Sequence, residues 1–139
     1  TTDLNKPIST ATQTALDLKV DKTTWTDYSN ISTIVGWSSF TQKHIWYKII
    51  DSYIFIDFYF EGTSNSTSIT FTCPNNSAQG FSVFRPCGLT ANNGVASVNP
   101  SRVQIPNATN VITIIRDLST GTWTASGVKS VAGQISFKI

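Results

Sequence analysis

Short stretches of apolar and aromatic residues recur along most of the chain, separated by Gly, Asn, Pro and Ser. The two clearest, His44–Ile50 and Tyr53–Glu61, are dense in β-branched and aromatic residues, which is typical of strands. Further strands are predicted at Ser32–Trp37, Ser68–Cys73, Phe81–Leu89, Val95–Val98, Arg102–Ile105, Val111–Arg116 and Gln134–Ile139, with a weaker short candidate at Gly121–Thr124. Short strands at a spacing of roughly 8–12 residues predict a mainly β fold, a jelly-roll-like antiparallel β-sandwich.

The first twenty residues follow a different pattern. Between residues 4 and 22, apolar side chains recur at alternating spacings of four and three, which predicts a helix with one narrow apolar stripe. Pro7 suits the first turn of such a helix, where its missing N–H costs nothing. The stripe consists of Leu4, Ile8, Ala11, Ala15 and Leu18.

This stripe is too narrow, and too rich in Ala and Thr, to stabilise a helix of about four turns alone, because isolated helices shorter than roughly 12–15 residues are marginal in water. We therefore expect the helix to pack against copies of itself or on a surface. The composition changes near residues 21–24, which predicts a helical neck over 1–23 and a β-sandwich head over 24–139.

Asp51 and Ser52 have turn chemistry and the length of a two-residue hairpin loop, which would place Ile50 opposite Tyr53. One face of this hairpin is then the core face, with Ile45, Tyr47, Ile49, Ile54, Ile56, Phe58 and Phe60. The other face places His44 opposite Tyr59, Trp46 opposite Asp57 and Lys48 opposite Phe55, with Glu61 just beyond.

The second face mixes aromatic rings with charged and polar groups, and three interpretations of it stay open. Sugar rings stack on Trp and Tyr while carboxylates and amides bind their hydroxyls, so His44, Trp46, Asp57 and Tyr59 have the ingredients of a glycan site. Aromatic residues are also enriched between subunits, where polar pairs fix the register. A groove between two subunits would combine both roles.

A second candidate site lies in the predicted loops. Trp123 lies between two glycines, and Asn92 and Asn93 offer amide groups as polar partners. The alternative for Trp123 is that it closes one end of the sandwich as part of the core.

The composition argues against several classes of function. Charged residues make up 13% of the chain and the net charge is +2, with the basic residues scattered, so we expect no nucleic-acid partner. No apolar run reaches eighteen residues, so we expect no membrane insertion. The chain begins with Thr1 rather than Met, which suggests a processed form or a piece of a longer protein.

Catalytic chemistry is not indicated either. A single histidine, His44, excludes a His-rich metal site. Cys73 and Cys87 could pair across a loop, but two free thiols are the favoured interpretation. Asp57 and Glu61 share one strand face at about 13 Å between Cα atoms, at about 3.3 Å per residue, too far apart for a glycosidase pair. The chain is therefore predicted to be a binding or structural module, not an enzyme, and to need no cofactor.

The stretch Asn5-Lys6-Pro7-Ile8-Ser9-Thr10-Ala11 through Gln13-Thr14-Ala15-Leu16-Asp17-Leu18-Lys19 resembles a segment that recurs in bacteriophage tail-fibre and baseplate proteins, Asn-Lys-Pro-x-Ser-x-x-x-Gln-x-Ala-Leu-x-x-Lys. The match covers about fifteen residues. The rest of the chain also looks like the head of a fibre tip, through Thr33–Trp37, Gly62–Thr67 and Trp123–Gln134.

The resemblance implies a trimeric coiled-coil neck ahead of a β head, in the C-terminal part of a phage fibre or receptor-binding protein. Such a protein would act in the virion as a homotrimer, attached to other fibre or baseplate proteins, and would recognise a host cell-surface glycan. Two alternatives are a structural fibre component, in tail or capsid, and a carbohydrate-binding module of a larger hydrolase. The family has no shared binding motif that maps onto particular residues here.

Overall fold

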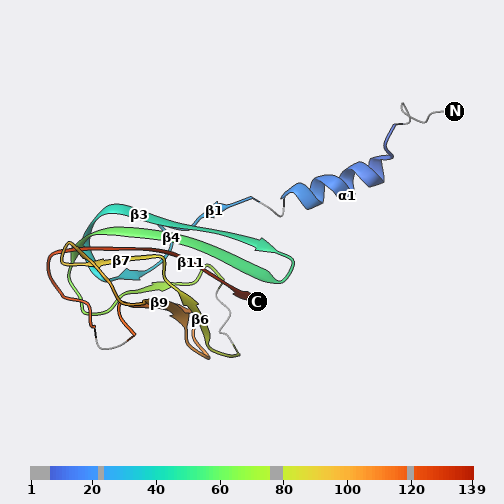
Figure 1. Cartoon of the computed structure of the whole chain (residues 1–139). Coiled ribbons are helices and arrows are strands. Elements are labelled where there is room, and N and C mark those ends of the chain that lie inside the picture. The colour runs from blue at the N-terminus through green and yellow to red at the C-terminus, as the bar shows by residue number, and fades with distance from the viewer. Residues whose placement is uncertain (1–6, 22–23, 76–79, 119–120) are drawn as a thin grey trace.

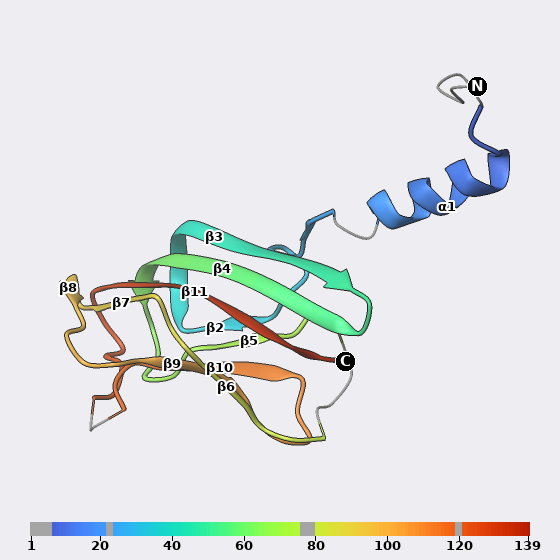
Figure 2. The same ribbon diagram turned by 45° about the vertical axis from the view of Figure 1, so that its right-hand side comes forward.

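Two antiparallel sheets face each other in the computed structural model, which describes residues 7–21, 24–75, 80–118 and 121–139 (Figures 1 and 2). The six-stranded sheet, in the order β1-β3-β4-β11-β7-β8, contains β1 (Thr26–Asp27), β3 (Trp37–Ile50), β4 (Tyr53–Ser64), β7 (Leu89–Asn92), β8 (Val95–Ala96) and β11 (Val128–Lys138). The five-stranded sheet, in the order β2-β5-β10-β9-β6, contains β2 (Ile34–Val35), β5 (Thr70–Thr72), β6 (Val83–Pro86), β9 (Arg102–Ile105) and β10 (Val111–Ile115). The predicted antiparallel β-sandwich is confirmed.

The core lies between the two sheets and is built from alternate residues of each strand. The predicted hairpin of β3 and β4 is confirmed in register, with Ile50 opposite Tyr53. Most of its predicted core face is buried, but Tyr47 is half-buried and Ile49 is exposed, because they lie near the edge strand and the hairpin turn. The largest apolar side chains that are fully buried are Ile45, Ile54, Ile56, Phe58, Phe60, Ile69, Phe71, Ile105, Ile112, Ile114 and Phe137.

Two tight turns use residues that tolerate positive φ. Asp51 opens the β3–β4 turn at φ 54°. Asn93 and Gly94 join β7 to β8 at φ 53° and 75°, which fits the Asn-Gly pair of a type I′ turn. This second hairpin was not predicted from the sequence.

Several strands differ from their predicted bounds. β3 begins at Trp37 and β11 at Val128, each well before the predicted start. The predicted strand Phe81–Leu89 is instead two strands in different sheets, since β6 ends at Pro86 and β7 begins at Leu89. Residues 121–124 form no strand, so that candidate was wrong.

The early part of β3 is irregular, with register shifts between Trp37 and Ser39 and between Phe40 and Gln42. Gly62 of β4 lies opposite this bulged segment. A Cβ atom there would overlap the carbonyl oxygen of Ser39 and lie 2.9 Å from the Cα of Phe40. Glycine is therefore required for the close approach of the two backbones.

The predicted N-terminal helix is α1 (Thr10–Asp21), and it begins later than expected. Ser9 caps it, because its Oγ accepts a bond from the backbone N–H of Thr12 at 3.2 Å. Pro7 and Ile8 therefore precede the helix, which corrects the placement of Pro7 in the first turn, and Leu4 lies outside the described residues.

Figure 1 shows α1 projecting away from the sandwich. All side chains described from residue 7 to residue 18 are exposed, including Ile8 at 59% and Leu18 at 60%, and also Ala11 and Ala15. The apolar stripe is thus uncovered by its own chain at its described members, Ile8, Ala11, Ala15 and Leu18. Among the described residues, no helix combines the length and apolar character needed to cross a bilayer.

Candidate ligand-binding face of the six-stranded sheet

Cross-strand pairing arranges the solvent side of the six-stranded sheet, here called the outer face, in three rows. The first row contains His44, Tyr59, Ala132 and Leu89, the second Asp27, Trp46, Asp57 and Gln134, and the third Lys48, Phe55 and Ser136. Each row crosses neighbouring strands, so residues far apart in sequence share one surface. The pairs His44–Tyr59, Trp46–Asp57 and Lys48–Phe55 are confirmed as predicted.

His44, Trp46 and Asp57 form a polar and aromatic cluster at the centre of the outer face. The Nε2 atom of His44 lies 3.8 Å from Oδ2 of Asp57, and the two side chains are 44% and 41% exposed. The imidazole and indole rings of His44 and Trp46 lie 5.6 Å apart between centroids. The half-buried indole of Trp46 is therefore flanked by hydrogen-bonding groups that water can reach.

Tyr59 is the fourth predicted residue, and its hydroxyl is already used within the chain. It donates a hydrogen bond to Oε2 of Glu61 at 2.7 Å, while Thr41 donates to the other carboxylate oxygen at 3.2 Å. The bond to Glu61 raises the pKa of Tyr59, since it stabilises the protonated phenol. The hydroxyl of Tyr59 is thus paired with Glu61.

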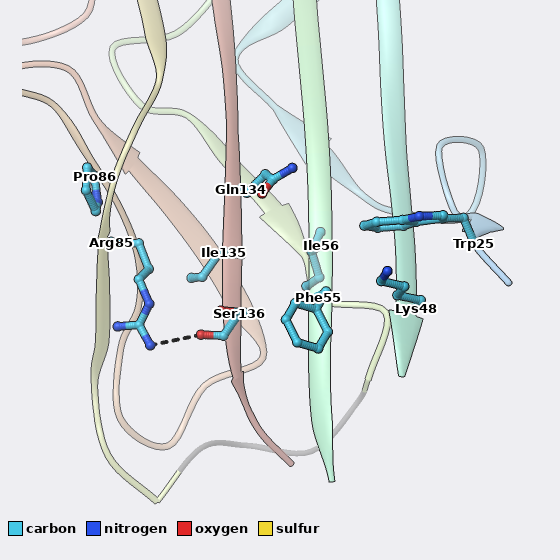
Figure 3. Close-up of a pocket in the computed structure, with 9 residues that line it drawn as sticks. All are labelled: Trp25, Lys48, Phe55, Ile56, Arg85, Pro86, Gln134, Ile135 and Ser136. Atoms are coloured by element: carbon cyan, nitrogen blue, oxygen red, sulfur yellow. Dashed lines mark hydrogen bonds between the residues drawn. The ribbon is translucent and has the colours of Figure 1, made fainter. Parts of the chain in front are cut away.

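Trp25, just before β1, separates two hollows on the outer face. One has a volume of about 330 Å³ and is lined by Trp25, His44, Trp46 and Asp57. The other, with a volume of about 420 Å³, is drawn in Figure 3 and is lined by Trp25, Lys48, Phe55, Ile56, Arg85, Pro86, Gln134, Ile135 and Ser136. We call these the central hollow and the cationic hollow.

The cationic hollow has a basic group at each side (Figure 3). Nζ of Lys48 lies 4.8 Å from the ring centroid of Trp25 and 5.9 Å from that of Phe55. Arg85 reaches in from β6, at the edge of the other sheet, and donates to the backbone oxygen of Ser136 at 3.0 Å. The floor between them is formed by Phe55 and Ser136.

Sequence reasoning missed Trp25, Arg85, Gln134 and Ser136 as members of this face. Gln134 and Ser136 could have been found by pairing the last strand with Tyr53–Glu61 and following the alternation of residues. Trp25 reaches the face from the segment before β1, and Arg85 reaches it because the two sheets pack against each other. No local sequence pattern predicts either position.

The predicted loop candidates do not belong to the outer face. Trp123 is only 4% exposed and its Nε1 donates to the backbone oxygen of Ile114 at 2.9 Å, in line with the alternative that it closes one end of the sandwich. Asn92 is buried and accepts bonds from the N–H and hydroxyl of Thr124. Asn93 is exposed and occupies the first position of the β7–β8 turn, at positive φ. Trp123 and Asn92 are thus buried side chains with hydrogen-bond partners inside the chain, and neither lies on the outer face.

The aromatic rings of the outer face could stack on a ligand, and the side chains around them can donate and accept hydrogen bonds. In the described ranges, no three His, Cys, Asp or Glu side chains gather in a way that could hold a metal ion. Both cysteines are free thiols, as predicted. Burial raises the pKa of each thiol to about 11.

No protein-family model matches the chain, and no curated protein has a matching sequence. The site is therefore interpreted from its own geometry.

Proposed function

We propose that this protein is the C-terminal part of a phage fibre or receptor-binding protein, and that its outer face binds a host cell-surface saccharide. The observation that carries the proposal is the central hollow. It places the half-buried indole of Trp46, which lines this hollow, beside Asp57 and His44, with Trp25 as a side wall. In this proposal the protein binds the saccharide and does not catalyse a reaction.

Saccharides suit such a surface because each sugar ring has an apolar face of C–H groups and a rim of hydroxyls. The apolar face stacks on an indole, and the hydroxyls bond to a carboxylate, an imidazole or an amide. Trp46 would supply the stacking surface. Asp57, the neighbour of Trp46 along the second row, would accept hydrogen bonds, and Gln134, which follows Asp57 in that row, would accept and donate them.

The same proposal includes a homotrimer with a jelly-roll-like head and a coiled-coil neck. Support comes from α1, whose stripe from Ile8 to Leu18 is exposed and narrow, as a helix that packs against its own copies requires. Three weak sites on one rigid tip raise the avidity by factors of about 10²–10⁴ over a single site. Other virion proteins would hold the preceding part of the fibre.

A glycan array probed with the intact chain tests receptor binding. We expect at least one saccharide to be retained by the wild-type chain and lost with Trp46→Ala. Tyr53→Ala is the matched control, because Tyr53 is an exposed aromatic at the hairpin end and lines neither hollow. Circular dichroism verifies that both variants fold.

If the array stays empty, or if Trp46→Ala binds like the wild type, the saccharide site is wrong. An empty array with an intact trimer would instead favour a structural fibre component, in which the outer face packs against a neighbouring subunit. Saccharide binding by a monomer would favour a carbohydrate-binding module of a larger hydrolase.

A further inference from the structure

We propose that the saccharide is acidic, and that the cationic hollow binds the carboxylate of a uronic-acid or sialic-acid residue. This inference rests on the proposed function and specifies its ligand. The central hollow would take a sugar ring on Trp46, and the carboxylate of the next residue would lie between Lys48 and Arg85.

The charges of the cationic hollow carry this inference. Lys48 and Arg85 both line it, and none of its lining residues is an acid. Within the part of the chain that the structure describes, neither base forms a salt bridge to a carboxylate. Two cations that share an aromatic-floored hollow without an anion create a positive potential, and a negatively charged ligand complements it.

Arg85 is already held in position for such a ligand. Its Nη1 donates to the backbone oxygen of Phe84 at 2.8 Å and its Nη2 to that of Ser136 at 3.0 Å. A guanidinium has five N–H groups, so three remain after these two bonds. A fixed, planar fork binds a carboxylate in bidentate geometry with little loss of conformational freedom.

Lys48 supplies the second charge from the opposite side. Its ammonium lies against the rings of Trp25 and Phe55, which limit the directions that it can take. A carboxylate at this point would meet a partly desolvated cation. Charge-assisted hydrogen bonds of this kind are stronger than those between neutral groups.

The neighbouring central hollow determines how the ligand lies. Asp57 is negative and would repel a carboxylate, so the acidic group is directed to the cationic hollow. Trp46 and Lys48 are two residues apart on one strand face, roughly 7 Å at about 3.3 Å per residue, which is comparable with the length of one sugar residue. Trp25 borders both hollows and can contact the ligand where it passes from one to the other.

The test uses an array printed with matched pairs, in which oligosaccharides that contain uronic or sialic acid stand beside their carboxyl methyl esters. We expect the intact chain to bind the acid member of at least one pair and its ester at least about tenfold more weakly, as the loss of a charge-assisted bond implies. Binding of the acid should weaken as the salt concentration rises.

Lys48→Gln and Arg85→Gln should each weaken binding of the acid by about tenfold, which corresponds to one such bond. Lys43→Gln is the matched control, because Lys43 is an exposed lysine of the same strand that lines neither hollow, and it should bind like the wild type. Arg85→Lys keeps the charge but loses the planar fork, so it should recover only part of the affinity.

Two results would overturn the inference alone. One is equal binding of acid and ester with Trp46→Ala still abolishing both, which leaves the proposed function intact. The other is binding of the acid that neither Lys48→Gln nor Arg85→Gln weakens. An array on which no saccharide is bound overturns the proposed function itself, and the inference with it.

Discussion

Trp37 and Lys129 make a hydrogen bond and a cation–π contact with each other at one end of the sandwich. Nε1 of Trp37 donates to the backbone oxygen of Lys129 at 3.1 Å, and Nζ of Lys129 lies 5.3 Å from the indole centroid of Trp37. The ammonium also lies 5.5 Å from the ring of Trp123 and donates to the backbone oxygen of Ser66 at 2.8 Å. Lys129 is fully buried, so its positive charge is stabilised by contacts with two indole rings and one carbonyl oxygen.

This burial predicts an unusual pH dependence of stability. Desolvation lowers the pKa of Lys129 from 10.5 to about 8. Between those two pH values the unfolded chain binds more protons at this site than the folded chain, so the lysine's contribution to the free energy of unfolding rises with pH. The destabilising cost of the buried charge is complete below about pH 8 and is relieved above it.

Urea unfolding at pH 7.5 and pH 10 measures this effect, with Lys129→Met as the reference. The free energy of unfolding of the wild type relative to the variant should rise by roughly 1–3 kcal/mol over this interval. The comparison with Lys129→Met is needed because the two cysteines also make stability depend on pH. Since folding raises the pKa values of Cys73 and Cys87, their contribution to the free energy of unfolding falls above about pH 9 in both proteins. If the difference in unfolding free energy between the two proteins does not change with pH, the ammonium of Lys129 is not buried as described.

The two thiols should resist alkylation in the folded protein. Burial raises their pKa values to about 11, so almost no thiolate exists at pH 8. We expect iodoacetamide to modify both cysteines slowly at pH 8 and at the rate of a free peptide thiol once urea unfolds the chain. Mass spectrometry follows the reaction, and rapid native labelling of Cys73, the more buried of the two, would be inconsistent with the core described here.

Gly62→Ala should destabilise the sandwich. The added Cβ would overlap the backbone at Ser39 and Phe40, which cannot move without disrupting the bulge in β3. We expect a loss of about 2–3 kcal/mol, in the range of overpacking substitutions. Gly80→Ala is the control, since no heavy atom lies within 4 Å of its Cβ position, and its melting temperature should change little. Equal melting temperatures for the two variants would show that the bulge relaxes freely.

Local patterns were enough to predict the centre of the fold. The β3–β4 hairpin could be predicted because long alternating strands flank a two-residue turn, and its register placed Trp46 beside Asp57. The start of β11 was missed because Gly133 and Lys129 interrupt the apolar alternation. In the structure Gly133 stands opposite Phe58 and leaves room for its ring, while Lys129 points into the core.

The candidate site could be predicted only in part, for a physical reason. His44, Trp46, Asp57 and Tyr59 share adjacent strands, so turn geometry alone brings them together. Arg85 reaches the outer face from the edge of the other sheet, and this approach depends on how the two sheets pack. The same packing buries Trp123, which no feature of its glycine-flanked segment could establish.

We propose that α1 gathers three identical heads on one tip. Sedimentation equilibrium of the full chain, beside a chain that begins at Thr24, measures this oligomeric state. We expect three times the monomer mass of 15.2 kDa for the full chain and a folded monomer for the shorter one. A full chain that sediments at 15.2 kDa at every concentration would contradict the trimer and the multivalent binding built on it.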